Sequence, residues 1–140
     1  MAITRADALT GNKKPEFFSD FLNSFTKTPV GEQLAKVVNE RAVNQSLKNL
    51  LKTNLGERLF QPYVGSNLYA MLFENNSVVT LETLVFYIET TVRNNEPRVN
   101  LLQVLVNETD SENEIDITII YNLINNPEPI TFNFILKRVR

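Results

Sequence analysis

The sequence contains no cysteine and no histidine, and it has four glycines among 140 residues. Without cysteine there are no disulfide bonds and no thiolate metal sites, and without histidine Ser–His–Asp and Cys–His catalysis are excluded. The side chain that ordinarily titrates near neutral pH is missing as well. Carboxylates, lysines, tyrosines and hydroxyl groups are therefore the groups that remain for acid–base chemistry.

Long hydrophobic runs and an excess of positive charge are missing too. No stretch approaches the roughly 18 apolar residues that a membrane span needs, and Met1–Asp7 lacks the apolar region of a signal peptide. The formal charge is −2, whereas proteins that bind nucleic acid generally are basic. We therefore expect cytoplasmic synthesis, with neither nucleic acid nor membrane as a partner. The length and the 43% hydrophobic content suit one domain with a core.

The spacing of apolar residues predicts an α+β domain in which about three helices pack on one face of a small mixed sheet, with a C-terminal three-strand segment and an extended N-terminal arm. Residues 34–38 read as a short strand. Helices are expected over 40–52, capped by Asn39, briefly after Ser66, and over 81–94, capped by Thr80. Three strands follow over 99–106, 115–122 and 130–137, joined by polar segments at 107–114 and 125–129. Leu59 and Phe60 are expected to form a short extended segment.

Residues 1–32 differ from the rest and are predicted to form an aromatic-containing arm on a domain of residues 33–140. Phe17, Phe21 and Phe25 are four residues apart and could share one face of a helix. Two interpretations stay open. The arm packs on its own domain, or its aromatic side chains become buried only against a neighbouring subunit.

Glu96-Pro97-Arg98 stands where the last predicted helix must end. Pro97 has no backbone N–H, and its ring biases Glu96 away from helical geometry. One interpretation is a surface ion pair that contributes roughly 0–1 kcal/mol. The other is that Arg98 offers its planar fork of donors to a carboxylate or to carbonyl groups of a partner.

Two kinds of chemistry were weighed from the acidic residues. Asp110, Glu112, Glu114 and Asp116 alternate, but the loop lacks the glycine and the terminal glutamate of a helix–loop–helix calcium site, so a solvated hairpin tip is expected. A glycosidase needs two carboxylates across a cleft. No feature selects such a pair from Glu57, Glu74, Glu82, Glu89 and Glu96. We predict no enzyme, no catalytic residue, no cofactor and no metal.

Several short motifs occur in an order and spacing that resemble one known family. They are Leu34–Val38, Ala42–Leu51, Gly56–Pro62, Gly65, Leu72–Glu74 and Glu96–Arg98, the last followed by a valine strand. Over about residues 30–140 the chain resembles the baseplate wedge and sheath-initiator proteins of contractile phage tails. The TssE subunit of type VI secretion is related to them.

The resemblance implies a structural subunit of the virion tail baseplate, assembled in the host cytoplasm and present in several copies around a sixfold axis. Its implied partners are other wedge subunits, which form a helical core bundle, and the tail sheath protein. Glu96-Pro97-Arg98 would contact the core bundle, and the C-terminal strands would template the first sheath ring by strand addition. Residues expected to bind partners are Glu96, Pro97, Arg98, Gly56, Glu57, Arg58, Phe17, Phe21, Arg138 and Arg140.

Two alternatives remain. One is the equivalent subunit of a type VI secretion system or another contractile injection system, and the other is a cell-wall hydrolase. For the favoured interpretation, we expect Arg98→Ala to leave a folded protein that is not incorporated into wedges.

Overall fold

The computed structural model describes residues 15–28, 33–71, 78–109 and 114–137. The α+β prediction is confirmed, but the strands described pair antiparallel, so the predicted mixed sheet is wrong. The elements, in chain order, are β1 (Ser19–Phe21), β2 (Lys36–Val38), α1 (Glu40–Lys52), α2 (Leu68–Met71), α3 (Val78–Asn95), β3 (Val99–Glu108), β4 (Glu114–Leu123) and β5 (Asn126–Lys137). No helix in these ranges is long and apolar enough to cross a membrane.

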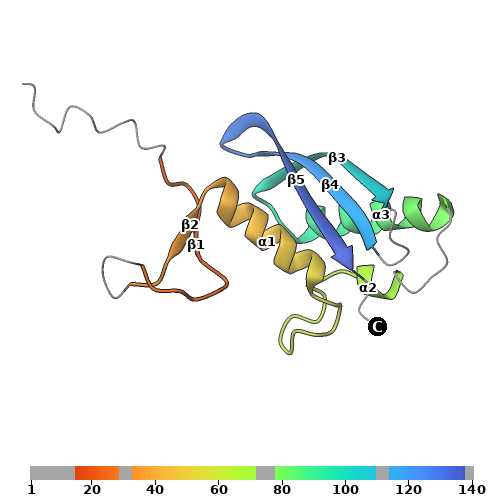
Figure 1. The fold of residues 1–140 in the computed structure, drawn as a ribbon, viewed down its shortest axis with the longest axis horizontal. Coiled ribbons are helices and arrows are strands. Elements are labelled where there is room, and N and C mark those ends of the chain that lie inside the picture. The colour runs from red at the N-terminus through yellow and green to blue at the C-terminus, as the bar shows by residue number, and fades with distance from the viewer. Residues whose placement is uncertain (1–14, 29–32, 72–77, 110–113, 138–140) are drawn as a thin grey trace, which may run out of the picture.

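A three-stranded antiparallel sheet in the order β3-β4-β5 forms the body of the domain, with α1 and α3 beside it (Figure 1). Along β4 every second side chain is buried, as the alternating sequence predicted. The core joins this face of the sheet to the apolar stripes of the two helices, including Leu47 and Leu51 of α1 and Ile88 and Val92 of α3. Burial of each such side chain contributes about 1.5–3 kcal/mol. The helices therefore cover one face of the sheet.

The turn between β4 and β5 is shorter than predicted. Leu123 pairs with Asn126, so Ile124 and Asn125 form the turn, whereas the sequence placed a connector over residues 125–129. The next pair is Tyr121 with Ile130, and the unequal spacing bulges β5 outward at residues 127–129. Two of these residues are prolines, which an edge strand tolerates because it needs no donor on its open side. They mark a bulged edge rather than a loop.

Both predicted N-caps need correction. Asn39 does precede α1, but its side chain makes no capping hydrogen bond. Its Oδ1 accepts from the Phe17 amide at 2.9 Å, and its Nδ2 donates to the Pro15 carbonyl at 3.0 Å. Asn39 therefore fastens the arm to the helix. Helix α3 begins at Val78, so Thr80 lies within its first turn and does not cap it.

The aromatic arm forms a hairpin, in keeping with the predicted extended arm, and Phe17, Phe21 and Phe25 do not share a helical face. Strand β1 pairs antiparallel with β2, with Ser19 opposite Val38, and the hairpin projects from the end of α1 (Figure 1). These two strands lie on opposite sides of the predicted boundary between residues 32 and 33. Phe18 packs against the core, whereas Phe17, Phe21 and Phe25 are largely exposed. The arm is thus attached through one phenylalanine and presents the other three to solvent.

Candidate docking surface

Glu96 and Arg98 form a buried acid paired with a base at the rim. The Glu96 amide donates to the Val92 carbonyl at 2.9 Å, and this hydrogen bond closes the last turn of α3. The Glu96 side chain turns inward, and the residue is only 3% exposed. Its two carboxylate oxygens accept from Arg98 Nε at 2.6 Å and Arg98 Nη2 at 2.7 Å. Ser46 of α1 donates a third hydrogen bond at 2.7 Å. The interpretation as a surface ion pair is therefore wrong, since the carboxylate lies inside the protein.

The protonation states of this pair follow from its contacts. Burial raises the pKa of Glu96, but the hydrogen bonds from Arg98 and Ser46 and the charge of Arg98 outweigh burial, and the net pKa lies below the ordinary value. The hydrogen bond to Glu96 raises the pKa of Arg98, burial opposes this, and the charges of Glu96 and Asp20 add to it. Both groups are therefore ionised over the physiological range.

Arg98 also connects the arm to the helices. Its guanidinium carbon lies 5.6 Å from the centre of the Phe18 ring, within the range of a cation–π contact. Its side chain is 32% exposed, and its carbonyl accepts from the Ile124 amide in the β4–β5 turn at 3.2 Å. Arg98→Ala would thus remove the partner of a buried carboxylate. We therefore expect this change to lower stability, in addition to any effect on docking.

The loop between α1 and α2 is closed by its own hydrogen bonds. The Ser66 amide donates to the Thr53 carbonyl at 2.8 Å, and the Gly56 amide donates to the Pro62 carbonyl at 2.8 Å. Gly65 has φ +144°, and a Cβ there would lie 2.7 Å from the Thr53 carbonyl oxygen, so only glycine allows this approach. The loop is consequently an ordered protrusion, and Leu59 and Phe60 lie in a turn, not in the predicted extended segment.

Two polar residues of this region serve the loop itself. Glu57 accepts a hydrogen bond from the Asn54 amide at 2.9 Å. The Ser66 hydroxyl donates to the Leu51 carbonyl at 2.6 Å, which binds the loop to α1. Ser66 therefore binds the loop and does not cap α2, and Leu68 of that helix is buried.

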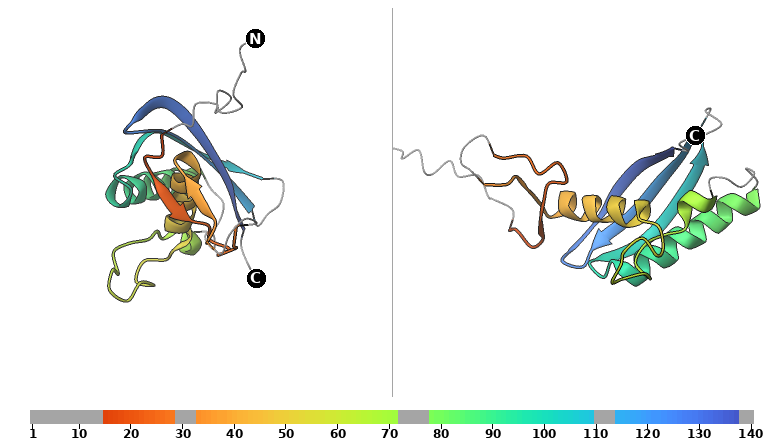
Figure 2. Two further views of the ribbon diagram at one scale, coloured as in Figure 1. Left: turned by 90° about the vertical axis from the view of Figure 1, so that its left-hand side faces the viewer. Right: turned by 90° about the horizontal axis from the view of Figure 1, so that it is seen from below.

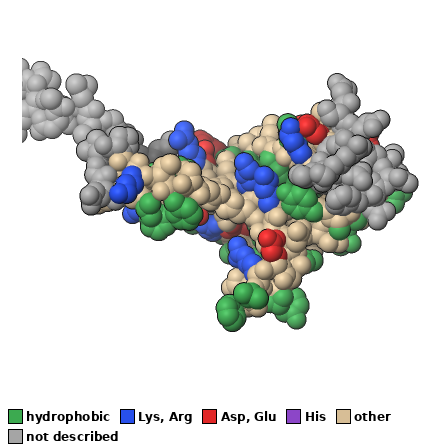
Figure 3. Space-filling model, turned by 60° about the horizontal axis from the view of Figure 1, so that its bottom comes forward, with side chains coloured by type: hydrophobic (Ala, Val, Ile, Leu, Met, Phe, Trp, Pro, Cys, Tyr) green, Lys and Arg blue, Asp and Glu red, His purple; other side chains and the backbone are tan. Residues whose placement is uncertain are grey.

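The tip of the loop carries three nearly fully exposed apolar side chains. Leu59, Phe60 and Tyr63 are 92%, 96% and 88% exposed. Figure 3 shows hydrophobic side chains gathered on the protrusion at the bottom of the view. Clusters of this kind mark interaction sites, because an isolated apolar side chain is common on a surface but a projecting group of three is not. We call these three residues the loop tip.

The sequence predictions had named Gly56, Glu57 and Arg58 in this loop but not the loop tip. Its signal in the sequence is apolar residues without helical or strand spacing, between glycines and a proline. That pattern does not say whether such residues turn inward or outward.

A polar pocket of about 200 Å³ connects the loop to the Glu96 site. Its walls come from β1, α1, the loop and the end of α3; they include Asp20, Ser46, Asn49, Arg58 and Glu96. Four segments that are far apart in sequence therefore meet here, and Arg58 and Glu96 line the same hollow. Of the residues predicted in the two motifs, Glu96 and Arg58 are the ones that line this pocket.

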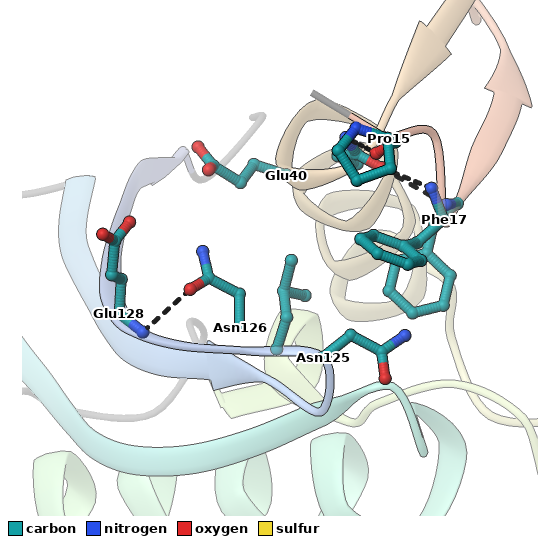
Figure 4. Close-up of a pocket in the computed structure, with 9 residues that line it drawn as sticks. Pro15, Phe17, Glu40, Asn125, Asn126 and Glu128 are labelled. Carbon is teal, nitrogen blue, oxygen red and sulfur yellow. Dashed lines mark hydrogen bonds between the residues drawn. The ribbon is translucent and has the colours of Figure 1, made fainter. Parts of the chain in front are cut away.

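A second pocket, of about 280 Å³, lies between the start of the arm, the N-terminus of α1 and the β4–β5 turn (Figure 4). Phe17 forms part of its apolar wall, and the carboxylates of Glu40 and Glu128 lie at its rim. Phe21 does not line this pocket, so the two predicted arm residues are in different surroundings. Arg138 and Arg140 lie outside the described residues.

The carboxylates considered for catalysis are engaged within the chain where the structure describes their contacts. Glu57 accepts from the loop backbone, Glu89 lies 3.8 Å from Arg93, and Glu96 pairs with Arg98. In the acidic hairpin, Glu114 lies 2.7 Å from Lys137. Asp110 and Glu112 of that hairpin, and Glu74 between α2 and α3, lie outside the described residues. Among the described residues there is no group of three or more acids that could hold a metal ion.

Known proteins with similar sequence or structure include baseplate proteins. Residues 37–128 match the family model described as baseplate wedge protein gp25. The baseplate wedge protein gp25 of Enterobacteria phage T4 is 32% identical over 99 residues, which cover 71% of this chain and 75% of the phage protein.

Solved structures share the fold. A chain of the anti-feeding prophage baseplate aligns with TM-score 0.61 at 19% identity, covering 88% of this chain and 87% of its own. A chain of the postcontracted pyocin R2 baseplate aligns with TM-score 0.56 at 20% identity, covering 70% and 96%. A Geobacter sulfurreducens protein described as a tail lysozyme aligns with TM-score 0.66 at 22% identity, covering 72% and 92%.

The family model covers most of the domain that carries the Glu96 site, the loop and the sheet, and the phage T4 protein matches at the level of sequence. This chain belongs to the gp25 family of baseplate wedge proteins.

Proposed function

We propose that this chain is a non-enzymatic subunit of a contractile-tail baseplate that docks on the helical core of the wedge and initiates the first sheath ring. The observation that carries the docking role is the projecting apolar loop tip, together with the polar pocket that Arg58 of the same loop lines with Glu96. Other baseplate subunits are the partners, in the virion tail, after assembly in the host cytoplasm.

The chemistry of this surface suits a helical partner. A convex loop tip with Leu59, Phe60 and Tyr63 becomes buried only against a concave apolar surface, such as the groove between two packed helices. Arg58 lies beside it, and its Nη1 contacts only the Gln61 side chain, at 3.4 Å, among the described residues. An acidic side chain at the rim of the groove would pair with Arg58 and set the register of docking.

Initiation of the sheath is assigned to the C-terminal sheet. Strand β5 is an edge strand, and an open edge offers backbone N–H and C=O groups to an incoming strand. Docking and initiation thus use opposite sides of α1, with the loop on one side and β5 on the other (Figure 2). One chain can therefore bridge the wedge and the sheath.

Two variants test the docking role. In Leu59→Ser/Phe60→Ser the loop tip loses its apolar side chains, and the protein should fold but be missing from purified baseplates. Val79→Ser is the matched control, because Val79 is also an exposed apolar residue but lies at the far end of α3. Normal amounts of the double variant in infectious tails would overturn the assignment. If the chain belongs to a contractile injection system and not to a phage tail, the double variant should be missing from the baseplate of that system in the same way.

The non-enzymatic assignment is tested separately. Purified protein is expected to release no soluble product from peptidoglycan. Turnover that one Glu→Gln change abolishes would show the hydrolase alternative instead.

A further inference from the structure

The β5 edge is the longest regular open edge of the sheet. Ile130 to Lys137 pair with Tyr121 to Glu114 without interruption, and no described strand lies on the other side of β5. The opposite edge, β3, is broken by an irregularity between Leu101 and Gln103. Irregularities of this kind protect an edge from pairing, so β5 is the better template for a further strand.

A shallow groove of about 420 Å³ runs along this edge, between β5 and α1. It is lined by Lys48 and Lys52 of α1, by Asp116 of β4 and by Asn133, Phe134 and Ile135 of β5. Ile135 is 49% exposed and provides an apolar patch on the edge strand. Two lysines face one aspartate, so the groove carries net positive charge.

The two lysines have a spacing that a strand can match. Residues four apart on a helix are separated by one turn, with a rise of about 6 Å. Side chains two apart on a strand lie on the same face about 6.6–6.8 Å from each other. Acidic side chains at alternate positions of an added strand can therefore face Lys48 and Lys52 simultaneously.

We propose that the β5 edge binds an extended segment of a partner protein that carries two acidic side chains at alternate positions, opposite Lys48 and Lys52. A second copy of this chain fits poorly, because pairing of two β5 edges about a twofold axis brings four lysines together at the joint. The inference rests on the proposed initiation of the sheath and specifies the chemistry of the strand that the sheath protein would supply.

Binding of a synthetic peptide tests the charge preference with the full chain. The probe is a ten-residue valine–threonine peptide with two glutamates at alternate positions, compared with the same peptide carrying two glutamines or two lysines. The glutamate peptide should bind about three- to tenfold more tightly than the glutamine peptide at low salt, and the preference should shrink at high salt. The lysine peptide should bind most weakly.

Charge reversal provides the second arm. K48E/K52E should invert the preference and favour the lysine peptide, whereas the control K36E, on β2 of the arm, should leave it unchanged. Hydrogen exchange should show new protection of β5 amides when the glutamate peptide binds. Equal binding of all three peptides, no binding, or protection confined to β3 would overturn the inference.

Assembly separates this inference from the proposed function. In K48E/K52E, the chain should still enter baseplates through its loop tip, but sheath rings should start less often. If K48E/K52E starts sheath rings normally, the proposed binding of an acidic strand is refuted, whereas the proposed docking on the wedge is unaffected. If the unaltered chain is missing from baseplates, the proposed function fails whatever the peptides show.

Discussion

Arg98 and Glu96 are only two residues apart and form a bidentate ion pair, in which Arg98 Nε and Nη2 donate to the two oxygens of a buried carboxylate. Pro97 between them makes the chain turn, so that acid and base reach each other within one short segment. The same arginine stacks on Phe18 of the arm. The pair therefore holds together three parts of the fold: Glu96 binds Ser46 of α1 at the end of α3, and Arg98 contacts the N-terminal hairpin through Phe18.

Arg98→Ala is expected to lower the free energy of unfolding by about 2 kcal/mol, because it leaves a buried carboxylate with Ser46 as its remaining side-chain donor. The partial exposure of Arg98 keeps the loss from being larger. Arg93→Ala is the control, because Arg93 forms an exposed ion pair with Glu89 at 3.8 Å. Its loss should lower the free energy of unfolding by roughly 0–0.5 kcal/mol. Urea unfolding measures both, and equal stabilities would contradict the role of the pair.

Acidification should weaken the fold through Glu96. Its folded pKa lies below the ordinary value of 4.5, so its contribution is fully present above that pH and is lost as the pH falls through the folded pKa. Glu96→Gln should be less stable than the unaltered chain at pH 7 and should lose less stability below pH 4.5. The urea midpoint followed from pH 7 to pH 3 checks this, and parallel curves for the two proteins would refute it.

Tyr121 should affect stability at alkaline pH. Its hydroxyl donates to Asn44 Oδ1 at 2.6 Å, and burial, followed by the charges of Glu40 and Glu96, raises its pKa well above 10. The neutral side chain is therefore favoured by folding, and its contribution, present below pH 10, is lost as the pH rises above that value. Tyr121→Phe should cost about 1 kcal/mol at pH 7 and flatten the alkaline loss. A steeper loss in the variant would show the sign to be wrong.

The loop should depend on Gly65 more than on Gly56. Gly65→Ala places a Cβ against the Thr53 carbonyl in a backbone conformation that disfavours side chains, and should cost about 2 kcal/mol or more. At Gly56, with φ +83° but open space, alanine should cost about 1 kcal/mol. Thermal unfolding of the two variants tests the order, and a reversed order would mean that the loop is closed in another way.

The sequence predicted the elements in which the spacing of apolar residues matches the face that is buried in the fold. Helix α1 has the predicted bounds, and β4 has the predicted alternation, because in each case one face is buried and the other is not. The start of β5 was predicted too late, because Pro127 and Pro129 indicated a connector over residues 125–129. Local sequence does not show that β5 lies at the edge of the sheet, where prolines are tolerated. The four-residue spacing of the arm phenylalanines allowed a helical face, but the same spacing is equally compatible with the hairpin that forms, whose side chains are largely exposed.

The burial of Glu96 could not be read from the sequence. It depends on Ser46, which is 50 residues away, and on Phe18, which stacks on the paired arginine. The sequence identified the motif, and the tertiary contacts show that its first role is to hold the fold together. The groups that remain exposed for a partner are the outer part of the Arg98 side chain and, separately, the loop tip.

The most direct test of the docking surface is hydroxyl-radical footprinting of the full chain, free and in purified tails. Phe60 and Tyr63 react readily when exposed, and the account predicts that labelling of both falls strongly in assembled tails. Exposed Phe86, on α3, is the internal control that should change less. Loop-tip labelling that is the same in free protein and in tails would contradict the central claim.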